Sequence, residues 1–116
     1  MFDAVTGAKK PDLVLNGHAH NYQRYDPLSR AGGGAPQQGI REIIVGTGGR
    51  NTFMDQKCTP GTTGCPAPVK TDFTKFGVGR LVWDSTSGQL RFQWWVATDD
   101  GTLAANPADS LTWACR

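Results

Sequence analysis

Two histidines, His18 and His20, are the residues of this 116-residue chain best suited to chemistry. They are its only histidines, and they follow the apolar run 13–15 and a glycine, Gly17. In extended backbone, residues i and i+2 point to the same side, about 6.6 Å apart, whereas on a helix they diverge by about 200°. Because neutral imidazole is a common metal ligand, the pair predicts a metal site just past a strand. The alternative is a pair of solvated or hydrogen-bonded loop histidines without metal.

Two apolar runs are expected to position these histidines. Residues 13–15 and 40–46 contain unbroken aliphatic stretches, which are typical of strands buried on both faces of a covered sheet. Residues 2–9 predict the last turns of a short N-terminal helix before Pro11. Helix, strand and a site at the strand end indicate a β-rich α/β fold, in which ligands gather at the carboxyl ends of strands.

A glycine loop, residues 46–49, ends the second apolar run. Its Gly-Thr-Gly-Gly spacing is not that of a nucleotide-binding loop, and no helical pattern follows it. We expect these glycines to let the backbone pass close to the histidine loop.

Residues 17–24, Gly-His-Ala-His-Asn-Tyr-Gln-Arg, resemble the Gly-His-x-His-x-Tyr-x-Arg motif of the calcineurin-like metallophosphoesterases, most closely the purple-acid-phosphatase-like branch. Residues 41–50 and 76–81 and the cysteine-containing tail resemble later segments of that family, in the same order. The resemblance implies part of an α/β/β/α sandwich, here mostly one mixed sheet. It also implies phosphoester hydrolysis by two metal ions (Fe, Zn or Mn), of which His18 and His20 each bind one.

The chain lacks the upstream motifs of that family: Asp-x-His, Gly-Asp-x-x-(Asp/Tyr), Gly-Asn-His-(Asp/Glu) and a further histidine. Two imidazoles cannot fill the coordination spheres of two ions. Asp12 lies at the far end of its strand, roughly 13–20 Å away, and Asp26 precedes Pro27 as a turn former. We therefore expect residues 1–116 to be one domain, the C-terminal portion of a metallophosphoesterase, inactive without the missing N-terminal part.

Tyr22 and Arg50 are the candidates for contacting a phosphoester substrate, and no general acid is identifiable. The favoured alternative for Tyr22 is a packing residue with its hydroxyl in water, and for Arg50 an ordinary surface arginine. Residues 26–39, rich in glycine and proline, predict a surface connection, with a lid over the site as the alternative.

The three cysteines predict one disulfide bond and, from it, the kind of cellular compartment in which the chain is found. Cys58 and Cys65 enclose a turn-rich loop, and a bond between them would stabilise the fold by about 2–3 kcal/mol. Cys115 is either free or paired with a cysteine in the missing part. A disulfide favours an oxidising compartment, secreted or periplasmic, although residues 1–116 show no signal peptide.

Alternating side chains over 77–84 and 89–96 predict a β-hairpin around the turn 85–88, and residues 111–115 predict a final short strand. The chain has four tryptophans, which leave open a different function, a secreted β-rich module that binds a polymer. Sheet packing is the ordinary role of such aromatic residues. A third possibility is a non-catalytic single-metal site shared between chains.

The charge pattern and the lack of a long apolar run argue against two classes of partner, nucleic acid and membrane. Twelve lysines and arginines against ten acidic residues give a net charge of +2, and the basic residues are scattered. Nucleic-acid binding, which needs a clustered basic stripe, is therefore not expected. No run of 18 apolar residues is present, so no membrane span is expected either.

Overall fold

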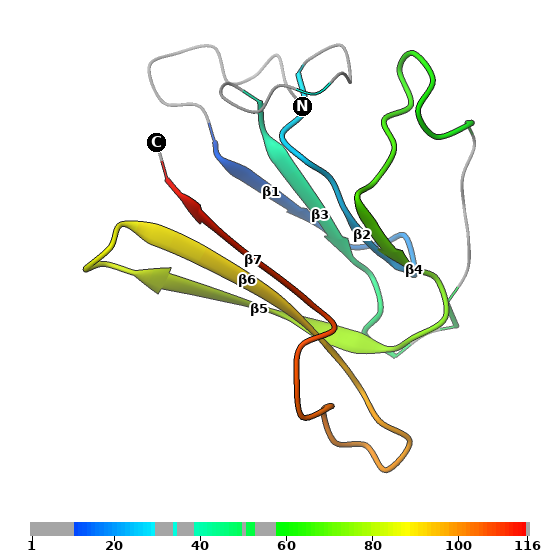
Figure 1. Cartoon of the computed structure of the whole chain (residues 1–116). Coiled ribbons are helices and arrows are strands. Elements are labelled where there is room, and N and C mark those ends of the chain that lie inside the picture. The colour runs from blue at the N-terminus through cyan, green and yellow to red at the C-terminus, as the bar shows by residue number, and fades with distance from the viewer. Residues whose placement is uncertain (1–10, 30–33, 35–38, 50, 53–57, 116) are drawn as a thin grey trace.

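The computed structural model describes residues 11–29, 34, 39–49, 51–52 and 58–115, and these residues form seven strands and no helix. The strands are β1 (Leu13–Asn16), β2 (Tyr22–Arg24), β3 (Arg41–Val45), β4 (Lys70–Asp72), β5 (Gly77–Asp84), β6 (Gln89–Val96) and β7 (Asp109–Ala114). They are arranged in two separate sheets (Figure 1). The prediction of a β-rich class is confirmed. The helix predicted at 2–9 lies outside the described residues.

The first sheet has the strand order β1-β3-β2-β4. β1 and β3 are parallel, whereas β2 is antiparallel to both of its neighbours, β3 and β4. β3 therefore lies between two strands that are consecutive in the chain. Its central residue, Ile43, is fully buried because it is covered within its own sheet and by the second sheet.

The second sheet is antiparallel, with the order β5-β6-β7. The prediction that the chain forms mostly one mixed sheet was therefore wrong. β6 places Phe92 and Trp94 on one face, and these large side chains pack against Tyr22 and Ile43 of the first sheet. Burying them requires the hairpin to lie across the face of the first sheet as a second layer.

The hairpin strands have the predicted bounds, 77–84 and 89–96, and the last strand begins two residues earlier than predicted. The expectation that the first apolar run is buried on both faces was wrong. Among the described strands β1 is at an edge of its sheet, and Leu15 is 52% exposed. β2 and β4 were not predicted, because three-residue strands are too short to show an alternating pattern.

The core lies between the sheets and is largely aromatic. The ring of Tyr22 stacks on that of Trp94, with centroids 4.2 Å apart and planes within 5°. Partly buried hydrophobic residues surround this centre: Leu13, Val45, Val96 and Trp113. Such stacked pairs contribute about 0.5–1.5 kcal/mol beyond the area they bury.

The sheets come together where β3 ends and β5 begins. The Gly77 amide donates to the Thr47 carbonyl at 3.2 Å, and the Thr47 hydroxyl donates to the Gly77 carbonyl at 2.9 Å. A Cβ atom on Gly79 would lie 2.9 Å from the Phe92 ring and 3.3 Å from Val45. Glycine at 79 thus allows the second sheet to approach the first closely.

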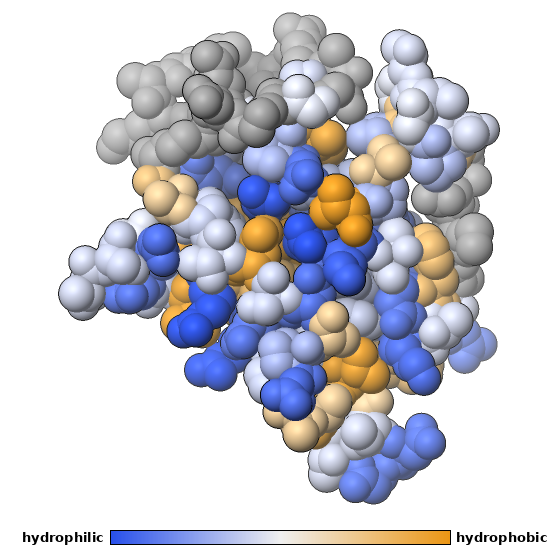
Figure 2. All heavy atoms as spheres, viewed as in Figure 1, coloured by the Kyte–Doolittle hydropathy of each residue, from blue (hydrophilic) through white to orange (hydrophobic). Residues whose placement is uncertain are grey.

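Figure 2 shows hydrophilic and hydrophobic side chains intermixed over the face seen in Figure 1. No helix among the described residues is long and apolar enough to cross a membrane.

Candidate metal-binding loop

Residues 17–21, here called the histidine loop, connect β1 to β2. Because β3 lies between these strands, the loop must cross the end of β3. The Gly46 amide, directly after β3, donates to the Asn21 carbonyl at 3.0 Å. The histidines therefore lie at the carboxyl ends of the parallel pair β1 and β3, the position at which open α/β sheets bind ligands.

Gly46 is where the loop and β3 are closest. A Cβ atom at this position would lie 1.7 Å from the Ala19 carbonyl oxygen and 3.3 Å from the His20 Cα atom. No side chain can occupy that space. The expectation that a glycine lets the backbone pass close to the histidine loop is therefore confirmed for Gly46, whereas a Cβ atom on Gly48 would meet nothing within 4 Å.

His18 has an unusual backbone conformation. Its φ is 69°, and it is the only non-glycine residue with positive φ in the described part of the chain. The Ala19 amide donates to the Gly17 carbonyl at 2.8 Å, which makes His18 the centre of a tight three-residue turn. A side chain in this region costs about 1–2 kcal/mol. The fold holds His18 in this conformation with its imidazole exposed to solvent.

His20 is half-buried, and its ring orientation is fixed by a backbone group. Its Nδ1 atom is 3.0 Å from the carbonyl oxygen of Asn51. A carbonyl only accepts, so Nδ1 carries the proton and, in the neutral ring, the lone pair is on Nε2. Metal-ligating histidines commonly have this arrangement, with one ring nitrogen donating to a carbonyl and the other binding the ion.

The histidine loop provides two nitrogen donors. Within the described ranges, no group of three or more histidine, cysteine, aspartate or glutamate side chains comes together. Asp26 is exposed and contacts Arg41 instead. Two imidazoles alone would leave half of the four positions of a tetrahedral ion to water or other ligands.

Tyr22, a candidate for contacting substrate, lies in the core between the two sheets. It is 1% exposed, and its hydroxyl donates to Asp109 Oδ2 at 2.6 Å. Tyr22 packs in the core, which agrees with the alternative given for it above. Its hydroxyl, however, is bonded to a buried carboxylate and does not lie in water. Burial, followed by the hydrogen bond to Asp109, raises the pKa of Tyr22. Arg50, the other substrate candidate, lies outside the described residues.

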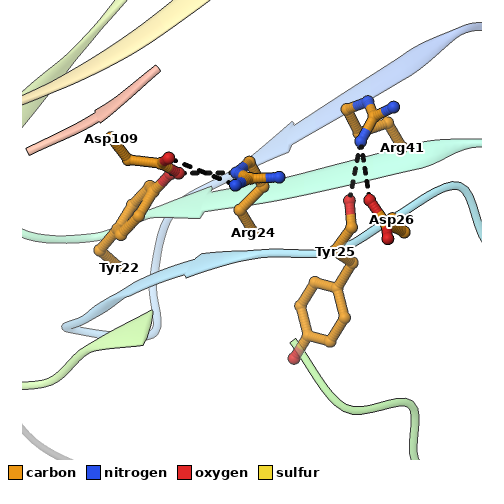
Figure 3. Close-up of polar contacts among 6 residues, drawn as sticks. All are labelled: Tyr22, Arg24, Tyr25, Asp26, Arg41 and Asp109. Atoms are coloured by element: carbon orange, nitrogen blue, oxygen red, sulfur yellow. Dashed lines mark hydrogen bonds and ion pairs between the residues drawn. The ribbon is translucent and has the colours of Figure 1, made fainter. Parts of the chain in front are cut away.

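Sequence reasoning missed the partner of Tyr22 and Arg24, which is Asp109 at the start of β7 (Figure 3). Arg24 Nε is 2.6 Å from Asp109 Oδ2, and its Nη2 is 3.2 Å from Oδ1, all in buried surroundings. Burial alone would raise the pKa of Asp109, but the hydrogen bonds from Arg24 and Tyr22 outweigh it and lower that pKa. We call these three residues the buried cluster. It links β2 of the first sheet to β7 of the second.

The disulfide and the 26–39 connection are the two remaining features that the sequence predicted. The structure contains the Cys58–Cys65 disulfide, with Cα atoms 6.1 Å apart, and Cys115 is an exposed free thiol. A hollow of about 540 Å³ is lined by Asp26, Leu28 and Gly34 on one side and by the disulfide loop and residues after it on the other. Neither histidine borders it. The described part of the 26–39 connection thus lines a space separate from the histidine loop.

The tryptophans do not form one exposed row. The strand register places Trp83, Trp94 and Trp113 on the face of the second sheet that packs on the first, and Trp95 on the opposite face. Trp94 is buried. Stacking on a polymer needs several aromatic rings on one accessible surface, so this arrangement does not favour the binding-module alternative.

Comparisons of the chain with protein-family models, with curated proteins and with solved structures found no match.

Proposed function

We propose that this chain is the C-terminal part of a calcineurin-like, purple-acid-phosphatase-like metallophosphoesterase, to which it supplies His18 and His20 as metal ligands. The observation that carries the proposal is the construction of the histidine loop. An exposed imidazole, His18, has a costly backbone conformation, and the loop passes so close to Gly46 that a side chain there would force the backbone to move. Costly conformations of this kind are found mainly where a function needs them.

In the proposed enzyme, His18 and His20 would each hold one ion of a pair of Fe, Zn or Mn. When bound, such a pair polarises phosphoryl oxygens and supplies hydroxide near neutral pH. The contribution of this chain is positioning. The bond from His20 Nδ1 to the Asn51 carbonyl fixes the ring and leaves the lone pair on Nε2, and the hydrogen bond between Gly46 and Asn21 anchors the end of the loop.

The remaining ligands, including a bridging carboxylate, would come from an N-terminal part of the same domain. The ligand number supports this division, since no group of three or more potential ligands forms among the described residues. The disulfide supports a secreted or periplasmic location.

The direct experiment is to read the DNA ahead of the Met1 codon in the source genome. An in-frame segment encoding the Asp-x-His and Asn-His motifs is the expected result. A natural transcript and protein that begin at Met1 would contradict the proposal. The purified chain should not hydrolyse p-nitrophenyl phosphate with Zn²⁺, Mn²⁺ or Fe²⁺, and turnover that is lost in His18→Asn would show that the chain is sufficient by itself.

A second candidate is a non-catalytic single-metal site shared between two chains. It is favoured by the ligand number, because two histidines from each of two chains give the four donors of a closed tetrahedral zinc site. This candidate predicts one Zn²⁺ per two chains and no turnover. Equilibrium dialysis followed by metal analysis distinguishes it from the first proposal, which predicts weak binding by the isolated chain without that stoichiometry.

A further inference from the structure

The exposed large hydrophobic side chains gather on one strand edge. Of the seven in the described residues, four lie between positions 76 and 83: Phe76, Val78, Leu81 and Trp83, which are 41–52% exposed. Along β5, every residue from Val78 to Asp84 is exposed except the half-buried Val82. Among the described strands, only β6 pairs with β5, so β5 is an edge strand whose start, Gly77, bonds to Thr47.

The edge strands of the first sheet carry the features that prevent association, and β5 does not; β7, the other edge of the second sheet, has six residues. β4 is three residues long with Lys70 and Asp72, and β1 has four residues. Short length and charged residues are the usual protection of an edge. β5 is eight residues long, has no proline or lysine, and has one charge, Arg80, before its last residue, Asp84. A long edge of this kind is a site for pairing with another strand.

We propose that this edge pairs with β5 of a second copy of the chain, in an antiparallel dimer centred on Val82. The proposal is independent of the proposed function. A two-fold axis at Val82 would place Val82 opposite its counterpart, and Leu81 opposite Trp83 of the second copy. The joined sheet would have six strands, in the order β7-β6-β5-β5-β6-β7. Such a contact is isologous and closes after two copies.

Charge complementarity selects the second copy and this register. With the axis at Val82, Arg80 of each copy lies opposite Asp84 of the other, and all remaining pairs from 80 to 84 are apolar. Centring the axis on Arg80 would place two guanidinium groups opposite each other, which is destabilising. Centring it on Leu81 would place Val78 opposite Asp84. The same short segment thus supplies both halves of a complementary pairing.

Cysteine crosslinking tests the register, in a Cys115→Ser background so that the native thiol does not contribute. Val82→Cys is expected to give a disulfide-linked dimer on mild oxidation, because directly opposed Cα atoms lie about 4.5–5.5 Å apart. Leu81→Cys and Arg80→Cys are matched controls on the same strand. In the proposed register Leu81 lies on a diagonal of about 7–8 Å from its counterpart. Arg80 is displaced from its counterpart by four residues, roughly 14 Å, so both controls are beyond the usual reach of a disulfide.

Light scattering coupled to size exclusion tests the association itself. At about 1 mM, at least tenfold above a dissociation constant of about 10⁻⁴–10⁻⁵ M, the measured mass should approach twice the 12.5 kDa of one chain. Arg80→Glu, which faces the partner's acidic residue, should shift the chain to monomer, whereas Lys70→Glu, on the exposed edge strand β4 of the first sheet, should remain dimeric. A monomeric wild-type chain would overturn the proposal. So would a dimer that crosslinks no better through Val82→Cys than through the two controls, which would place the contact or its register elsewhere.

Discussion

The two halves of the segment 17–24 are adjacent in sequence and opposite in character. The histidine loop is largely exposed, has a residue at positive φ, and holds its imidazoles at the end of the sheet. Tyr22 and Arg24, two and four residues beyond His20, are buried and bonded to a carboxylate 85 or more residues away. Tyr22 and Arg24 stabilise the packing of the two sheets, whereas the histidine loop leaves its imidazole nitrogens near the surface.

Within residues 17–24, the side chains that hold the sheets together are different from the two imidazoles proposed to bind metal. Alternation along β2 points both Tyr22 and Arg24 toward the second sheet, where Asp109 accepts hydrogen bonds from each. These bonds hold the start of β2 against β7, and the histidine loop ends where β2 begins. Polar residues next to the histidine loop thus serve to hold the two sheets together.

The largest expected effect is that of Asp109→Ala. Removing one partner of a buried ion pair leaves the other charge without compensation, which costs about 3–5 kcal/mol. Urea unfolding measures the loss. The matched control is Asp26→Ala, which removes the exposed partner of Arg41, 3.5 Å away (Figure 3), and should cost under about 1 kcal/mol. Equal losses from the two variants would remove the distinction between the buried cluster and a surface pair.

Tyr22→Phe should cause the next largest loss of stability. It keeps the ring stacked on Trp94 but removes the hydroxyl that donates to Asp109. A hydrogen bond to a charged group contributes about 1.5–3 kcal/mol, and the same unfolding experiment detects a loss of that size. An unchanged free energy of unfolding would mean that Arg24 alone satisfies the carboxylate.

Gly46→Ala tests how the fold supports the histidine loop. Its methyl group would collide with the Ala19 carbonyl, so the loop or the end of β3 must move, at a cost of about 1–3 kcal/mol. The imidazole NMR signal of His20 should move as well. Gly48→Ala is the matched control, since it has open space and no positive φ, and it should change stability by less than about 1 kcal/mol. Equal effects of the two substitutions would contradict the close approach.

The pH dependence of stability should report the buried cluster. The pKa of Asp109 is lowered in the folded chain, so its stabilisation is present above the unfolded value of about 3.9 and is lost as pH falls through the folded value. Below about pH 4, stability should decline by no more than about 1.4 kcal/mol per pH unit from this one group. Asp109→Asn should decline less steeply than wild type over the same range, and parallel curves would show that other carboxylates dominate.

The histidines should contribute least to stability. His18→Asn keeps a residue that tolerates positive φ, and His20→Ala loses one hydrogen bond to a carbonyl. Each should change the free energy of unfolding by less than about 1 kcal/mol, while weakening Zn²⁺ binding in equilibrium dialysis at least several-fold. A large loss of stability would assign these side chains to the fold.

Local patterns in the sequence predicted the parts of the structure that depend on neighbours in the chain. The hairpin followed from period-two alternation, the disulfide from a short loop, and the role of Gly46 from its place after a strand. What could not be predicted depends on distant residues. Nothing near Tyr22 or Arg24 indicates Asp109, and nothing in 89–96 shows whether the hairpin extends the first sheet or packs on it. The position of β3 between β1 and β2 likewise arises only from the assembled sheet.

The most direct test of the central claim is imidazole NMR of the ¹⁵N-labelled chain during titration with Zn²⁺. Before metal, the His20 ring should be the Nδ1-protonated tautomer. As Zn²⁺ is added, both rings should shift or broaden saturably, and His20 should respond through Nε2. If either ring stays unchanged to millimolar Zn²⁺, or if His20 carries its proton on Nε2, the proposal that the histidine loop binds metal is contradicted.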